Sequence, residues 1–229
     1  MITGIYQSGA GLATLQQMQE IVAYNLANVS TRGFKQEVWS VNQTEPTYQN
    51  VTRELDAQAG PLSSTSTPTH LALAGEGYFT VLTPQGPAYT RNGQFHLDHQ
   101  GRLVTREGFA VQGQNGDVTP ATPEFTVTAA GEVVVNGEIT DRLQIVNGSG
   151  PERRLGQTLV TWNSADQVQP LPPEKVEVLQ GMLEGSNVDL VESMVNLLSV
   201  VRMYEANQQA LQTQDSALSQ ALEAGKVRL

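Results

Sequence analysis

Few side chains in this sequence stand in a pattern that could support chemistry. His96, Asp98 and His99 are of types that ligate metals, but they fall at a predicted strand end and turn, where alternation points the two histidines apart. We therefore expect exposed turn residues and no metal site here. Residues 75–77 (GEG) begin like a nucleotide-binding loop, yet Thr80 stands where G-x-G-x-x-G needs its third glycine, and a strand is expected to follow. We interpret this segment as a turn.

Nucleophilic catalysis has no visible set of residues either. A hydrolase needs a base held beside its nucleophile, and the chain has 3 histidines and no nucleophile-elbow motif. It has no cysteine, which excludes a disulfide framework and a thiolate metal site. We expect no catalytic residue, no cofactor and no small-molecule substrate. A secreted enzyme or adhesin built on a β domain is an outside alternative.

The charge balance disfavours nucleic acid as a partner. The chain has 229 residues, of which 13 are basic and 23 acidic, for a formal net charge of -10. Affinity for a phosphate backbone comes mainly from lysine and arginine. No window approaches the roughly 20 apolar residues that span a bilayer, and residues 1–20 lack the basic and apolar regions of a secretory signal. We expect neither membrane insertion nor a cleaved signal peptide.

The sequence predicts two long helices, one at each end of the chain. Apolar residues three and four apart form a seam in each, as in helices that pack along other helices. The N-terminal seam contains Leu12, Leu15, Val22 and Leu26, and the C-terminal seam contains Leu190, Met194, Leu197, Val201, Tyr204, Leu211 and Leu218. Ser186 and Asn187 are candidate N-caps. One partner helix cannot fully cover the C-terminal seam, so we expect neighbouring subunits to bury the remainder.

Between the helices the sequence predicts a compact antiparallel β domain. Short alternating runs are separated by turn residues such as Asn92-Gly93 and Asn136-Gly137. Residues 45–69 are rich in Pro, Ser, Thr and Gly, which favours an extended linker. The predicted class is α+β, with the terminal helices paired like a coiled coil. We divide the chain into an N-terminal axial helix and joint (1–35), a linker or loop arm (36–69), a central β domain (70–182) and a C-terminal axial helix (183–229). A self-contained monomer whose helices pack on its own sheet is the alternative.

Four segments, in this order along the chain, resemble the bacterial flagellar rod and hook family. They are residues 25–35 (NLANVSTRGFK), 71–81 (LALAGEGYFTV), 89–113 (with YTRNGQF and DHQGRLVTREGFAVQG) and 183–205 (LEGSNVDLVESMVNLLSVVRMYE). The resemblance implies a structural subunit of the flagellar basal-body rod, required for motility, whose helices pair in an inner axial layer with the β domain outside.

The same resemblance implies partners and a place in the cell. The partners are other copies and other rod or hook proteins, and the flagellar type III apparatus exports the chain unfolded without a cleaved signal. The place is the rod that spans the periplasm. We favour a proximal rod position over a distal one, because the segment between Lys35 and Leu71 is short. A hook or hook-associated subunit is the alternative within the family.

Residues 25–35 are predicted to form a joint. Asn25 and Asn28 lie three apart on one helical face, off the apolar seam, where their amides could bond across subunits and fix the register. Thr31, Gly33 and Phe34 would redirect the chain outward, Gly33 through a positive φ and Phe34 as an apolar anchor. The alternative is ordinary helix capping by polar residues.

Overall fold

The chain folds into two units, each built from segments that are distant in sequence. The computed structural model describes residues 2–45, 48–122, 124–148, 152–162 and 164–226. Unit 1 combines Met1–Ala27, Glu37–Glu54 and Asp189–Leu229, and unit 2 combines Asn28–Gln36 and Leu55–Val188. Two long helices and an antiparallel β domain make up these units, which confirms the α+β class.

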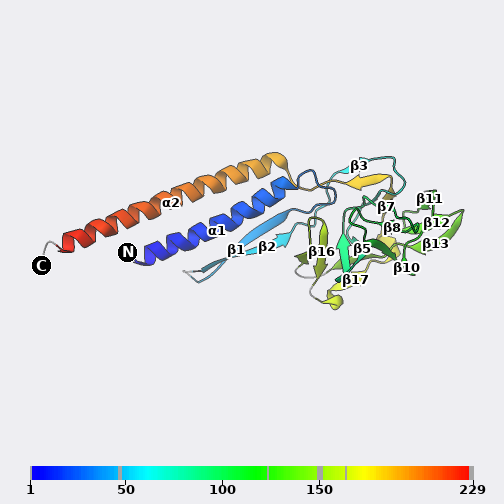
Figure 1. Ribbon diagram of the computed structural model, residues 1–229, viewed down its shortest axis with the longest axis horizontal. Helices are drawn as coiled ribbons and strands as arrows, with labels where there is room; N and C mark the ends of the chain where they lie inside the picture. Colours follow the sequence, from blue (N-terminus) through cyan, green and yellow to red (C-terminus); the bar gives the residue numbers. More distant parts are fainter. Residues whose placement is uncertain (1, 46–47, 123, 149–151, 163, 227–229) are drawn as a thin grey trace. The chain divides into compact units, whose positions relative to one another are not determined.

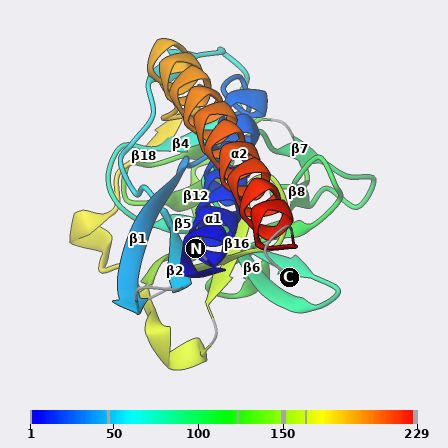
Figure 2. The same cartoon turned by 90° about the vertical axis from the view of Figure 1, so that its left-hand side faces the viewer.

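Unit 1 contains the two terminal helices and one hairpin. Helix α1 (Ile2–Ala27) and helix α2 (Leu190–Lys226) lie side by side and run in opposite directions (Figure 1). Strands β1 (Glu37–Glu45) and β2 (Tyr48–Leu55) form a two-stranded sheet, and β1 contacts α1. Helix α1 therefore has α2 on one side and the hairpin on another, as the end-on view also shows (Figure 2).

The start of α2 differs from the expected one. Asp189 is the N-cap, because its Oδ1 accepts the backbone N–H of Glu192 at 2.9 Å and Leu190 is the first helical residue. The prediction of Ser186 or Asn187 as the cap is wrong. The Ser186 hydroxyl instead accepts the N–H of Val188 at 3.2 Å, and the Asn187 side chain is used elsewhere in unit 2. The acidic residue directly before the helix was the better signal.

Residues 36–69, expected to be a linker, contain regular strands. Besides β1 and β2, strand β3 (Leu62–Ser64) lies in this segment. Aromatic and β-branched residues such as Trp39, Val51 and Thr52 favour extended structure, and pairing of the two runs satisfies their backbone groups. Only the part rich in Pro, Ser and Thr after Leu55 has little regular structure.

Unit 2 is an antiparallel β domain built around one large sheet. Ten strands join in the order β15-β16-β6-β5-β9-β8-β7, with β10 beside β9, and β14 pairing with both β5 and β17. A three-stranded sheet β11-β12-β13 and the pairs β18-β4 and β19-β3 complete it. The bounds are β4 (Leu71–Leu73), β5 (Tyr78–Thr83), β6 (Gly86–Thr90), β7 (His96–Leu97), β8 (Leu103–Val104), β9 (Ala110–Gly113), β10 (Gly116–Asp117), β11 (Phe125–Val127), β12 (Glu132–Val135), β13 (Glu138–Arg142), β14 (Ile145–Gly148), β15 (Glu152–Arg154), β16 (Leu159–Trp162), β17 (Val168–Pro170), β18 (Val178–Gln180) and β19 (Met182–Glu184).

Strand β5 of unit 2 is buried on both faces from Tyr78 to Val81. Phe79 and Val81 of β5 are fully buried, whereas Leu82, near the end of the strand, is 49% exposed. The Phe79 ring meets Phe95 edge to face, with the ring centroids 5.3 Å apart. A separate aromatic cluster gathers Tyr78, Tyr89 and Trp162. The predicted β domain between the helices is therefore confirmed as a packed body with its own core.

Candidate functional site: the joint

The amide of Asn25 bonds within the chain. Its Nδ2 donates to the carbonyl of Glu37 at 2.7 Å, and its Oδ1 accepts the N–H of Glu37 at 2.8 Å. The side chain is 5% exposed. Both ends of the amide thus hold the first residue of β1 against α1, and a further bond across subunits stays a prediction. A buried amide satisfied on both sides fixes where β1 begins.

Asn28 and Thr31 form a local turn directly after α1. The backbone N–H of Thr31 donates to the carbonyl of Asn28 at 3.0 Å, and the Thr31 hydroxyl donates to Asn28 Oδ1 at 3.1 Å. Asn28 is 3% exposed. These local bonds are of the kind that the capping alternative describes, and a contact of Asn28 with another subunit stays a prediction.

Gly33 has a backbone conformation that side chains resist. Its φ is +64°, which confirms the predicted positive value. A Cβ added at this position would clash with the backbone of Arg91 and Asn92. Its N–H donates to the carbonyl of Glu184 at 2.9 Å. Glycine is required here both for the turn and for the close approach of another backbone.

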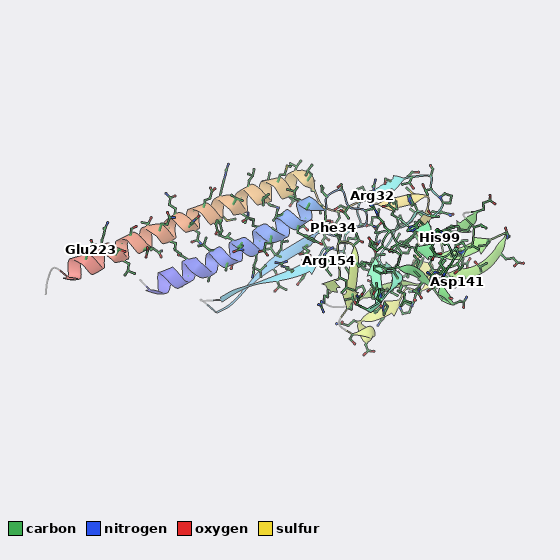
Figure 3. The ribbon with its side chains drawn as sticks, viewed as in Figure 1. Arg32, Phe34, His99, Asp141, Arg154 and Glu223 are labelled. Carbon is green, nitrogen blue, oxygen red and sulfur yellow. The ribbon has the colours of Figure 1, made fainter. Side chains whose placement is uncertain are left out.

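Phe34 is the buried anchor of the joint. Its side chain is fully buried, as predicted, and the Arg154 guanidinium lies 4.6 Å from its ring centroid (Figure 3). The same arginine donates from Nη2 to the carbonyl of Lys35 at 2.7 Å. One cation thus covers the ring and ties the next residue, which combines a cation–π contact with a hydrogen bond.

Lys35, the last residue of the joint, belongs to a buried ion cluster that also contains Arg91 and Glu184. Lys35 Nζ is 2.8 Å from Glu184 Oε1, and Arg91 Nη1 is 3.3 Å from Glu184 Oε2. The three side chains are at most 3% exposed. Glu184 Oε1 also accepts the N–H of Gly60 at 2.9 Å. One carboxylate therefore pairs with two cations from distant parts of the chain, and the cluster keeps a net positive charge.

Backbone carbonyls compensate this excess of positive charge. Lys35 Nζ also donates to the carbonyl of Gln58, and Arg91 Nη2 donates to the carbonyl of Gly75 at 2.7 Å. Burial, the largest effect, holds the pKa of Lys35 below its ordinary value even though the neighbouring Glu184 favours the charged form. Loss of Glu184 would leave both cations buried without a counter-charge, which costs about 3–5 kcal/mol in comparable pairs.

Asn187 ties the segment before α2 to the end of the joint. Its Oδ1 accepts the N–H of Gln36 at 2.7 Å, and its Nδ2 donates to the carbonyls of Asp56 at 3.1 Å and Gln58 at 3.3 Å. With the ion cluster, this amide brings residues 33–36, 56–60 and 184–187 together in unit 2. The chain therefore enters and leaves unit 2 at one place.

Sequence reasoning missed the ion cluster, although each member lies in a segment that it had singled out. Lys35 ends residues 25–35, Arg91 lies in residues 89–113 and Glu184 opens residues 183–205. Glu184 lies between Leu183 and Gly185, a setting typical of a buried and paired charge, and Lys35 follows Phe34. Arg91 lies between the polar residues Thr90 and Asn92, so its sequence neighbours did not indicate burial.

The structure places the seam residues on partly different faces. In α1, Val22 is buried and Leu12, Leu15 and Leu26 are half-buried, and Ile21, not part of the predicted seam, is fully buried. In α2, the half-buried members are Leu197, Val201, Tyr204, Leu211 and Leu218. Leu190 and Met194 are 44% and 49% exposed, while Ser193 and Val200 are buried. The apolar surface of α2 is thus wider than the face that α1 covers.

The described residues include no group of three or more His, Cys, Asp or Glu side chains that could hold a metal ion. His96 and His99 are exposed. The Asp98 carboxylate accepts Nε of Arg102 at 2.9 Å and the N–H of Gln100 at 2.8 Å. In the part of the chain that the structure describes, neither α1 nor α2 contains a stretch apolar enough to span a membrane.

Comparisons with known proteins converge on one family. Three family models match: flagella basal body rod protein at residues 5–35, flagellar hook protein FlgE/F/G D1 domain at 72–135, and flagellar basal body rod FlgEFG protein C-terminal at 179–224. The chain is 32% identical to flagellar basal-body rod protein FlgG of Buchnera aphidicola subsp. Acyrthosiphon pisum, over 95% of this chain and 98% of that protein. It is 31% identical to FlgF of Escherichia coli, over 93% and 94%. It is 28% identical to FlgF of Rhizobium meliloti, over 97% and 98%. The three matched ranges contain the joint, Arg91 and Glu184.

Proposed function

This chain belongs to the family of flagellar basal-body rod and hook proteins and is a structural subunit of the rod, and from this premise we propose that it assembles helically through its two terminal helices. The relatives named above are all rod proteins, which favours the rod over the hook. The proposal includes pairing of α1 and α2 in the manner of a coiled coil within an axial layer.

The observation that carries this proposal is the small apolar core of unit 1. Among its described residues, the buried apolar side chains are Ile21, Val22 and Val200. Helices of 26 and 37 residues gain little stability from so small a core, because most helical stability in proteins comes from tertiary packing. Six apolar residues of α2 are instead between 44% and 70% exposed: Leu190, Val191, Met194, Val195, Leu198 and Met203. Such a patch fits a contact with other subunits.

The joint has a mechanical part in this proposal and no part in catalysis. Its ion cluster, the glycine turn and Asn187 hold the backbone entry and exit of unit 2 in one arrangement. A subunit that must repeat along a rod needs each copy to leave its β domain in the same way. Buried charged networks that specify one arrangement are a known use of such costly groups, and we assign that use here.

Partners and location follow from the family. The rod places the protein in the basal body, in contact with other rod or hook subunits. Within the proposal, the flagellar export apparatus passes the chain unfolded and without a cleaved signal, and the chain occupies a proximal position. Neither nucleic acid nor a membrane-inserted segment is part of the proposed assembly.

Incorporation into basal bodies tests the proposal. A tagged chain, expressed in cells that lack their own copy, should restore swimming and co-purify with basal bodies. Replacing Val191 and Leu198 by Asp should abolish both, since the change puts charge on the exposed apolar face. Replacing Gln209 and Gln212 by Asp adds the same charge to exposed polar positions of α2 and serves as the matched control. Equal incorporation of the two double variants would contradict assembly through this face, and recovery in the hook fraction alone would favour the hook alternative.

A further inference from the structure

Unit 2 has a groove that the joint helps to form. Residues 30–32 of the joint line it together with the turns 83–85, 106–109 and 155–159 and with Asn92 and Gln94, and its volume is about 750 Å³. Pockets of roughly 300–1,000 Å³ are large enough to bury several side chains of a bound segment.

The groove combines apolar and cationic groups. Leu155 is 45% exposed at one wall and Phe109 is half-buried at another. Arg32 and Arg106 supply two positive charges against one from Glu107, so the lining is net positive in a chain of net charge -10. Within the described residues, the Arg106 guanidinium has no ion pair or hydrogen bond. The groove therefore suits a segment with an apolar side chain next to a carboxylate.

Another part of unit 2 presents such a segment. The turn between β12 and β13 has Asn136 at φ +53° and Gly137 at φ +86°, the tight hairpin turn expected for this dipeptide. Ile139, two residues later, is 63% exposed, and Glu138 beside it is exposed. The Asp141 carboxylate is already bonded to Asn115, at 3.2 Å from its Nδ2. The exposed groups of this hairpin therefore include one isoleucine next to one carboxylate.

We propose that the β12–β13 hairpin of one copy enters the groove of a second copy, with Ile139 against Leu155 and Phe109 and with Glu138 facing Arg106. The proposal rests on the proposed rod function, because it requires copies of this chain to be neighbours. The occupant is a second copy because one unit carries both complementary surfaces, apolar with acidic on the hairpin and apolar with cationic in the groove. The two surfaces differ, so the contact can repeat head to tail from one copy to the next, as an assembly along a rod requires. Figure 1 shows β12 and β13 at the opposite end of unit 2 from β16, whose preceding turn lines the groove.

Thiol cross-linking tests the contact directly, because the natural chain contains no cysteine. Cells carry two differently tagged copies, one with Ile139→Cys and one with Leu155→Cys. Their basal bodies are treated with a short bis-maleimide. We expect a cross-linked species that contains both tags. The matched control replaces Leu155→Cys by Leu62→Cys, at a similarly exposed leucine outside the groove, and should lose that species.

The outcomes separate this inference from the function on which it rests. Both copies present in basal bodies, but without the mixed species or with equal yield from the Leu62→Cys control, would overturn the hairpin contact and leave the rod function standing. Cross-links from Ile139→Cys to itself or to another protein would also overturn it. Absence of both copies from basal bodies would overturn the rod function and this inference with it.

A charge exchange gives a second test. Arg106→Glu and Glu138→Lys should each lower the mixed cross-linked species several-fold, and the two together should restore it, since the opposite charges again face one another across copies. Lys175→Glu, at an exposed lysine outside both surfaces, is the control and should leave the yield unchanged. Failure of the double change to restore the species would contradict the pairing of Glu138 with Arg106.

Discussion

Glu184 lies between two buried cations, Lys35 and Arg91. Removing the carboxylate should therefore destabilise unit 2 more than removing one of the cations. Glu184→Gln leaves Lys35 and Arg91 buried without a counter-charge, so we expect a loss of about 3–5 kcal/mol in the free energy of unfolding of unit 2. Lys35→Met leaves the Arg91–Glu184 pair intact and unpairs only backbone carbonyls, for which we expect a loss of about 1–3 kcal/mol. Urea unfolding followed by Trp162 fluorescence measures both.

The prediction is tested by comparing the losses in free energy of unfolding of the two variants. Glu174→Gln, at an exposed carboxylate, is the control and should change the free energy of unfolding by less than about 0.5 kcal/mol. If Lys35→Met destabilises unit 2 more than Glu184→Gln does, the carboxylate is not the centre of the cluster.

His70 makes the stability of unit 2 sensitive to mild acid. Burial, and then the positive charge of Arg32, hold the pKa of His70 below its ordinary value of 6.5. In the window between that lowered pKa and 6.5, the unfolded chain binds a proton that the folded chain does not bind. Stability therefore falls as the pH decreases through this window. We expect His70→Gln to flatten the dependence of unfolding free energy on pH between about 5 and 7. An equal slope in both proteins would show that His70 does not contribute.

Gly9 and Gly11 of α1 differ in their surroundings, so replacing each by alanine tests helix propensity at one position and packing against α2 at the other. A Cβ added at Gly9 has no neighbour within 4 Å, so Gly9→Ala should stabilise unit 1 by about 0.5–1 kcal/mol. A Cβ added at Gly11 would lie 2.9 Å from Asn207 Nδ2, which donates to the carbonyl of Ser8 at 3.1 Å. Gly11→Ala should therefore gain less or destabilise. Thermal unfolding followed by circular dichroism of the helices compares the two, and an equal gain would argue against close packing of α2 at Gly11.

The spacing of apolar residues predicted both helices and the β domain, because this spacing reflects local structure. The positive φ of Gly33 and the burial of Phe34 were also predictable, since a glycine between a polar turn and an aromatic residue constrains its own neighbourhood. The pairing of Lys35 and Arg91 with Glu184 could not be predicted. Lys35 and Glu184 are 149 residues apart, and no local pattern states which distant charge will meet which. The partner of Asn25 within the chain was missed for the same reason, because Glu37 lies beyond the helix whose face we had considered.

Truncation at two points tests whether unit 2 is a folding unit. A chain that ends at Val188 retains all segments of unit 2, including Glu184 and Asn187. We expect it to keep a cooperative unfolding transition and the buried environment of Trp162. A chain that ends at Met182 lacks the carboxylate of the ion cluster and the amide that binds Gln36, and should be less stable by several kcal/mol. Equal stability of the two truncated chains would mean that the joint does not contribute to this unit.

At the scale of the whole molecule, we expect the terminal helices to gain their stability from neighbouring subunits. The most direct measurement is amide hydrogen exchange in a dilute, verified monomer and in isolated rods. In the monomer we predict fast exchange along α1 and α2 and slow exchange in β5, β6 and β9, because the buried apolar core lies mainly in unit 2. In rods we predict slow exchange in all of these elements. Helices that are as strongly protected in the monomer as the β core is, with no change on assembly, would contradict stabilisation of the helices by neighbouring subunits.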